Sequence, residues 1–553
     1  MKLRQQKLCK MPRGRVRRKV ASALVLAMSA TTVFPAFAGP PPEGSDRYSW
    51  YIPSEDSGGL WHDEEDEDRE RIATDSDAEY ATWSNAVLTA MESFNSKVEF
   101  VDSEGKVLEG NTPDELSVPQ DEKNFPYLSQ QAGCTREDYG FSDTYEEHEY
   151  FLKGSANIYD IKDGKLATAS NAAKATSSNA QEEYVDRIIV FKPKDAADFS
   201  GVVFVDILNA SSKTDIASLW RQSYDYIMEK GAVYVGVTSK DVTVKSLKTF
   251  NQDRYAALKW GDDNGIFWDI LGQVGTLLKQ ENSPILYGED YSGDVNSYLF
   301  GSSQSGWYVN TFANNFGLAN FVAEDAADLE TYEDYKDCVG SADHIFDGYL
   351  NFVGGMMDTS IAKKQSSKTR MFMPVKATDV PFILMVGEND YNPGPVRHDS
   401  DDPDNMYRHY VVAGGPHSDI IFPADPTDEL QMQTGRDTRE YVDFKGDHTV
   451  TDFNITVFIN AALENLDNWA QNGESAPCGP YKDEVAGSMN GMAFAPERDE
   501  FGNMTSGIIS PQISVPVASY YGGANGAFSD KSGSMIYLAQ DQVESLYGDR
   551  DTY

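Results

Sequence analysis

From about residue 125 onward, the sequence alternates short apolar runs with stretches of helical character, and Gly, Pro or Asp bounds most of them. Residues 216–230 and 267–279 are examples of the helical stretches. Continuously apolar strands separated by helices indicate a mostly parallel sheet that helices cover on both faces. We therefore predict an α/β fold with an eight-stranded, mostly parallel sheet. The expected strands are 149–158, 187–191, 202–208, 232–237, 298–300, 344–353, 382–386 and 407–412.

The segment SYLFGSSQSG, residues 297–306, contains the most informative motif of the chain. A nucleophile elbow is a tight strand-to-helix turn that exposes one serine and needs small residues two positions before and after it. Gly301 and Ser305 occupy these two positions around Ser303, although the motif has glycine where this chain has Ser305. Ser303 is the candidate nucleophile, and a serine-rich loop after an ordinary strand is the alternative.

A serine hydroxyl becomes a useful nucleophile only with a histidine base and a carboxylate that orients the histidine. In an α/β hydrolase these residues follow the serine in the order acid, then histidine, in loops after late strands. Asp390 lies in the GEND turn after a buried strand and is our candidate acid, with Glu388 of the same turn as the alternative. His417 follows the last strand in the turn GGPH and is the candidate base.

Three other histidines lie late in the chain but fit the role less well. His398 is in an acidic loop, His409 is within a strand and His448 precedes a helix. The tetrahedral intermediate also needs two backbone N–H donors. We expect one from Gln304, which follows the nucleophile, and the other from Asn209 or Ala210 in the loop after the third strand.

The first 38 residues carry nine Lys or Arg and no Asp or Glu, and they include the apolar run 20–34. They end in Ala-Phe-Ala, directly before Gly39. A basic leader, a short hydrophobic stretch and an Ala-x-Ala site are typical of a cleaved export signal. We predict a signal peptide over residues 1–38 and a secreted, extracellular protein, with a retained membrane anchor as the alternative.

Cleavage there would leave 38 of the 47 basic residues against all 88 acidic ones. Such a surface repels nucleic acid and anionic membranes, and no later apolar run is long enough to form a stable membrane span. Cys134, Cys338 and Cys478 would remain, an odd number without Cys-x-x-Cys spacing, and their pairing cannot be deduced from the sequence. No metal site or cofactor is indicated, and the oligomeric state stays open.

The remaining chain divides by composition into an acidic N-terminal extension, residues 39–124, and a hydrolase domain, residues 125–553. Within this domain, residues 319–342 are rich in Asp, Glu and Tyr and are a candidate lid. Residues from about 495 to 553 contain Pro-, Gly- and Tyr-rich sequence beyond the candidate histidine. We expect this C-terminal arm to be an extended structural segment that lies over the domain.

The sequence also resembles the little-characterised family of alpha/beta hydrolase domain proteins, from about residue 127 to the C-terminus. The G-x-S-Q-S-G form of the elbow is typical of that family. The resemblance implies an α/β-hydrolase fold and carboxylic-ester hydrolysis, with Ser303 as nucleophile, His417 as histidine and the GEND turn as source of the acid. The matching segments are residues 146–159, 199–212, 231–247, 253–262, FGSSQSG, IFDGYLNFVGG, VVAGGPHSD and 500–522.

The expected function is a secreted serine hydrolase that cleaves a small-molecule or polymeric carboxylic ester through an acyl-enzyme intermediate. Amide hydrolysis, lactone hydrolysis and acyl transfer use the same machinery and are alternatives. A non-catalytic binding protein with a hydrolase fold is an alternative of another class, because fold alone does not establish activity.

Overall fold

The computed structural model describes residues 89–548 with gaps, of which the main ones are 129–143, 169–180, 317–343, 362–369, 391–396, 418–444, 481–495 and 524–532. The expected signal peptide and the candidate lid therefore lie outside the described residues, as do Cys134 and Cys338. Cys478 is an exposed free thiol. In the described part of the chain, no helix is long and apolar enough to cross a membrane.

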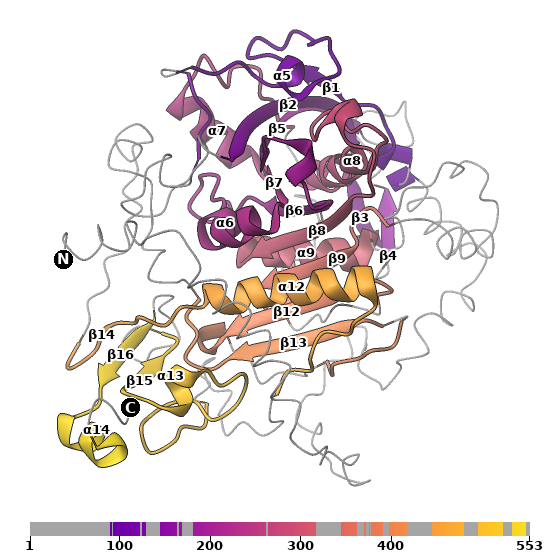
Figure 1. Ribbon diagram of the computed structural model, residues 1–553. Coiled ribbons are helices and arrows are strands. Elements are labelled where there is room, and N and C mark those ends of the chain that lie inside the picture. Colours follow the sequence, from indigo (N-terminus) through magenta and orange to yellow (C-terminus); the bar gives the residue numbers. More distant parts are fainter. Residues whose placement is uncertain are drawn as a thin grey trace.

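A single large sheet runs through the described part of the chain (Figure 1). Its order is β1-β2-β5-β7-β6-β8-β9-β12-β13, and the six strands from β7 to β13 are parallel, while β1, β2 and β5 are antiparallel at one edge. The strands are β1 (Glu99–Val101), β2 (Tyr145–Asn157), β5 (Gln181–Pro193), β6 (Val202–Ile207), β7 (Val233–Val237), β8 (Asn296–Ser302), β9 (Gly348–Phe352), β12 (Phe382–Gly387) and β13 (Tyr407–Val412).

The direction in which the sheet grows reverses at β6. After β6 the chain crosses to β7 on one side, and it later returns to place β8 on the other side of β6. Loops that leave neighbouring parallel strands in opposite directions open a crevice at the carboxyl ends of those strands. The loops after β6 and β8 therefore flank the position where a ligand is expected.

Helices cover both faces of the sheet (Figure 1). On one face, α12 packs on β9 and β12 and also contacts α6, whereas α9 packs on β8 and β9 from the other face, beside α8. Both α6 and α12 end at a glycine in the left-handed conformation, which terminates a helix without a Cβ penalty. The helices are α6 (Ser218–Lys230), α7 (Asp241–Phe250), α8 (Phe267–Lys279), α9 (Gln304–Phe316) and α12 (Thr456–Asn472).

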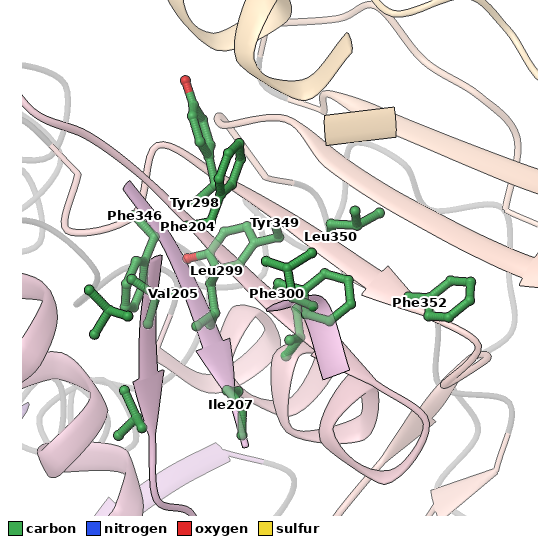
Figure 2. Close-up of a cluster of buried hydrophobic side chains, with 14 of the residues drawn as sticks. Phe204, Val205, Ile207, Tyr298, Leu299, Phe300, Phe346, Tyr349, Leu350 and Phe352 are labelled. Atoms are coloured by element: carbon green, nitrogen blue, oxygen red, sulfur yellow. The ribbon is translucent and has the colours of Figure 1, made fainter. Parts of the chain in front are cut away.

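The core is built from the central strands, whose side chains point alternately to the two helix layers. Figure 2 shows this packing for side chains of β6, β8 and β9. The ring centroids of Phe204 and Tyr298 lie 5.9 Å apart, and those of Phe300 and Phe352 lie 6.4 Å apart. The Tyr298 hydroxyl donates to Asp467 of α12 at 2.8 Å, so the polar group of this core tyrosine has a hydrogen-bond partner.

Smaller elements surround the main sheet. Next to β13, β14, β16 and β15 form a three-stranded sheet that joins residues 449–450 to the C-terminal arm (Figure 1). The remaining elements are α5 (Pro113–Leu116), β3 (Tyr159–Lys162), β4 (Lys165–Thr168), η3 (Ala196–Asp198), η4 (Asn264–Ile266), η5 (Gly288–Asp290), β10 (Met357–Asp358), β11 (Arg370–Met371), η8 (Glu388–Asp390), β14 (Thr449–Val450), α13 (Pro511–Ser514), β15 (Ala518–Tyr521), β16 (Ser534–Tyr537) and α14 (Gln540–Tyr547).

The predicted α/β class and mostly parallel sheet are confirmed, and each of the eight expected strands overlaps an observed one. The sequence prediction missed β1, whose three residues pair antiparallel with β2 at the sheet edge. Such a short strand has too little apolar periodicity to be detected, and it lies in the segment that we expected to be an N-terminal extension. The domain boundary at residue 125 stays a prediction.

A buried ionic network joins the antiparallel edge of the sheet to its carboxyl-end loops. Glu149 of β2 accepts hydrogen bonds from Arg187 of β5 and from Arg254, the latter at 2.6 Å. Burial alone would raise the pKa of Glu149, but the two guanidinium groups hold it below its usual value. Arg187 also pairs with Asp215 in the loop after β6, and Asp215 accepts from Thr238 after β7 at 2.6 Å. The network thereby ties the loop after β6, which borders the crevice, to the segment after β7.

We expect Glu149→Gln to lower the free energy of unfolding by about 3–5 kcal/mol, because it leaves the buried guanidinium of Arg254 without a carboxylate and that of Arg187 with Asp215 alone. Denaturant titration measures this change. Glu99→Gln is the matched control, because Glu99 forms an exposed pair with Lys153 at the same edge of the sheet. The control should change stability little, and equal effects of the two variants would contradict a structural role for the buried network.

Candidate active site

Ser303 is the one residue between β8 and α9, and its φ of 56° is left-handed. A serine in this conformation costs about 1–2 kcal/mol relative to ordinary backbone. Two hydrogen bonds hold the turn: the Ser303 N–H donates to the carbonyl of Phe352 at 2.8 Å, and the Ser303 carbonyl accepts from Gly306 at 2.9 Å. A Cβ on Gly301 would lie 2.3 Å from the carbonyl oxygen of Ser305, so this position requires glycine.

The structure brings the three predicted residues together. The Nε2 atom of His417 lies 2.9 Å from Oγ of Ser303, and its Nδ1 atom lies 2.6 Å from Oδ1 of Asp390. An ionised carboxylate only accepts hydrogen bonds, so Nδ1 carries the proton and Nε2 accepts from the serine hydroxyl. The side chains of Asp390 and His417 are only 18% and 10% exposed, respectively.

The backbone of residues 387–390, the acid turn, lies against the backbone of residues 413–417, the histidine loop. Asp390 lies in η8, directly after β12, and His417 is the fifth residue after β13. Both residues therefore follow neighbouring parallel strands. A Cβ on Gly387 would lie 2.4 Å from the carbonyl oxygen of Gly415. The close approach that glycine permits here brings the carboxylate within reach of the imidazole.

Glu388, the alternative acid, points elsewhere. Its Oε2 accepts from the N–H of Gly414 at 3.0 Å, and its Oε1 accepts from Arg498. Its side chain is 3% exposed, and it makes no hydrogen bond to His417. The geometry therefore favours Asp390 as the partner of the imidazole.

The other late histidines stand apart from Ser303. His409 lies within β13, where burial lowers its pKa to about 4. The Nδ1 atom of His448 lies 3.1 Å from Oγ of Ser534 in β16. Among the described residues, His417 is the histidine within hydrogen-bond distance of the Ser303 hydroxyl.

The loop after β6 presents the expected second oxyanion donor beside the elbow. The Asn209 N–H already donates to the Ile216 carbonyl at 2.9 Å, and its side-chain amide donates to the carbonyl of Ser302 at 2.7 Å. The N–H of Ala210 makes no hydrogen bond to any described residue. Gln304 opens α9, so its N–H has no partner within the helix. Of the two candidates in this loop, Ala210 is the one whose N–H is available.

Lys240 is a residue of this region that the sequence prediction did not select. It follows β7, and its ammonium donates to the side-chain oxygen of Gln304 at 2.6 Å and lies 5.1 Å from the ring centroid of Tyr308. Burial lowers the pKa of Lys240 to about 8. Its place after a parallel strand was visible in the sequence, but its contact with Gln304 depends on the packing of two distant segments.

We expect the stability difference between wild type and Lys240→Met to depend on pH. The folded-state pKa of about 8 lies below the ordinary value of 10.5, so the unfolded chain binds more protons between these values. The wild type should therefore gain stability relative to the variant as the pH rises from 8 toward 10.5. Denaturant titrations at several pH values measure this slope.

Lys245→Met is the control, because Lys245 is exposed and pairs with Asp241 within the same helix. That variant should show no comparable slope. A difference between wild type and Lys240→Met that does not vary with pH would contradict the burial of the ammonium.

Comparison with solved structures finds chains of low sequence identity and low TM-score, two of which are described as esterases. Est1E from Butyrivibrio proteoclasticus is 9% identical, with 51% of this chain and 95% of that chain covered and a TM-score of 0.22. Esterase B from Lactobacillus rhamnosis is 11% identical, with coverage of 59% and 88% and a TM-score of 0.26. An esterase from Rhizomucor miehei is 8% identical, with coverage of 51% and 81% and a TM-score of 0.23.

No curated protein matches the chain. The sequence profile of one family, described as alpha/beta hydrolase domain, matches residues 111–553, which is most of the 553-residue chain. The match includes β2 to β13, the elbow, both late loops and the C-terminal arm. This protein therefore belongs to the alpha/beta hydrolase domain family.

Proposed function

We propose that the protein is a serine hydrolase that cleaves a carboxylic ester through an acyl-enzyme intermediate. The observation that carries this proposal is the continuous hydrogen-bonded chain from Ser303 through His417 to Asp390, with distances of 2.9 and 2.6 Å. Family membership adds the fold, but the side-chain geometry is what points to the chemistry.

In the first step, Ser303 Oγ attacks the ester carbonyl carbon while His417 Nε2 takes the hydroxyl proton. The imidazolium that forms is stabilised by Asp390, which also holds the ring in the required tautomer. The carbonyl oxygen becomes an oxyanion, and we assign the N–H groups of Gln304 and Ala210 as the donors that bind it. Collapse of the intermediate breaks the bond to the alcohol, which leaves with the proton from His417.

In the second step, water replaces the alcohol. His417 takes a proton from the water as it attacks the acyl carbon, and returns it to Ser303 Oγ when the acid product leaves. Both steps use the same groups, so the described residues can complete the cycle without a further side chain. Amides and lactones would react at the same atoms, and a panel of acyl esters, amides and lactones of graded size distinguishes them.

Export from the cell is also part of the proposal. The basic leader of residues 1–38 and its Ala-Phe-Ala end are typical of a cleaved signal, and the acidic composition suits an extracellular protein. The expected substrate is accordingly an ester met outside the cell.

We expect a fluorophosphonate probe to label the wild type but not Ser303→Ala, because the probe reacts only with an activated serine. Ester hydrolysis should fall by on the order of 10⁶-fold in the same variant. Gel fluorescence and peptide mass spectrometry identify the labelled residue. Ser302→Ala, at the neighbouring serine, should still label; persistent labelling of Ser303→Ala would rule out the proposed nucleophile.

We expect Asp390→Asn to lower kcat by about 10⁴-fold, because the amide favours the wrong tautomer of the imidazole. Glu388→Gln should cost about tenfold or less, since a glutamine oxygen can still accept from Gly414. Steady-state kinetics on the best ester of the panel measures both variants. The reverse order of the two losses would make Glu388 the acid.

A further inference from the structure

The C-terminal arm extends the sheet next to the strand that leads to the histidine. By C-terminal arm we mean the described residues from 496 onward. Ile508 forms a parallel bridge with Val412: its N–H donates to Val411 at 2.6 Å, and its carbonyl accepts from Ala413 at 3.2 Å. The arm therefore pairs with the end of β13, directly before the histidine loop 413–417.

Arg498 of this arm reaches the acid turn. Its guanidinium donates to Oε1 of Glu388 and, at 2.8 Å, to the carbonyl of Gly502 in its own segment. The group also lies 4.6 Å from the ring centroid of Tyr521. The Arg498 side chain is 24% exposed, whereas that of Glu388 is 3% exposed. Arg498 therefore lies between the buried carboxylate and the solvent.

The second oxygen of Glu388 binds the histidine loop. It accepts from the N–H of Gly414 at 3.0 Å, three residues before His417. The arm also packs directly on both segments, since a Cβ on Gly522 would lie 2.5 Å from the Asn389 nitrogen and 2.8 Å from the Gly415 carbonyl oxygen. One carboxylate thus connects three segments that meet at the site: the arm, the acid turn and the histidine loop.

Charge explains why this connection needs Arg498. A buried carboxylate without a cation is costly, and Glu388 stands only two residues from Asp390. Arg498 of the arm is the cation that binds it, while Asp390 of the same turn pairs with His417 of the neighbouring loop. Arg498 neutralises one of the two carboxylates and leaves Asp390 to interact with the imidazole.

We propose that Arg498 is a positioning residue of the active site: by neutralising the buried Glu388, it lets that side chain hold the histidine loop through Gly414 and keeps Asp390 as the carboxylate that pairs with His417. This inference rests on the proposed serine-hydrolase function for its catalytic consequence. The contacts themselves are independent of that function, so they can be tested separately.

The experiment compares Arg498→Met, Arg498→Lys, Glu388→Gln and the double variant Arg498→Met/Glu388→Gln. We expect Arg498→Met to lower kcat by about tenfold or more through misplacement of the imidazole, with KM changed less. Arg498→Lys should retain part of the activity.

The double variant separates positioning from simple attachment of the arm. It has no buried carboxylate to leave unpaired, so its kcat should return to the level of Glu388→Gln. Lys153→Met removes one positive charge at the opposite edge of the sheet and controls for net charge. A double variant as slow as Arg498→Met, or a fully active Arg498→Met, would overturn the proposal.

Hydrogen–deuterium exchange gives a readout that does not depend on activity. Peptides that contain Gly414 should exchange faster in Arg498→Met than in wild type, and near the wild-type rate in the double variant. If the wild type neither labels with the probe nor cleaves esters, the proposed function fails, and exchange alone decides the positioning role. Unchanged exchange at Gly414 in Arg498→Met then overturns it.

Discussion

The left-handed turn at Ser303 is the constraint around which the rest of the site is arranged. One residue must end β8, start α9 and project its side chain above the sheet. The strained backbone is kept by its hydrogen bond to Phe352 and by the close packing that Gly301 allows. Because the turn sits between β6 and β9, the loop after β6 and the N-terminus of α9 meet at the same point. The candidate nucleophile and the candidate oxyanion donors Gln304 and Ala210 therefore lie around the same turn.

Hydrogen bonds from side chains hold neighbouring loops of the site together. Parallel strands have no direct connection at their carboxyl ends, so each loop there needs lateral support. The amide of Asn209 donates to the carbonyl of Ser302, and the hydroxyl of Ser239 donates to the carbonyl of Leu208 at 2.7 Å. Glu388 plays the corresponding part between the acid turn and the histidine loop. The site is thus bordered on both sides by polar contacts between segments distant in sequence.

The two carboxylates of the GEND turn show which kind of contact the sequence does not predict. Both lie just past β12, so position along the chain could not separate them. In the structure, Glu388 turns to Gly414 and Arg498, whereas Asp390 turns to His417. The decisive partner, Arg498, is 110 residues away in the sequence, and no local pattern signals such a contact. Lys240 was missed for the same reason, because it meets Gln304 across 64 residues.

The amino-acid sequence was enough to predict the α/β class, the location of eight strands, the elbow at Ser303 and the order of the serine, acid and histidine candidates. These features are local, since apolar runs, turn residues and a tight motif leave their signature within a few neighbouring positions. The folded chain was needed to see that Asp390 faces the imidazole, that the N–H of Ala210 rather than that of Asn209 is available, and that the C-terminal arm reaches the acid turn. These choices depend on distances between remote segments, which packing and burial set when the sheet assembles.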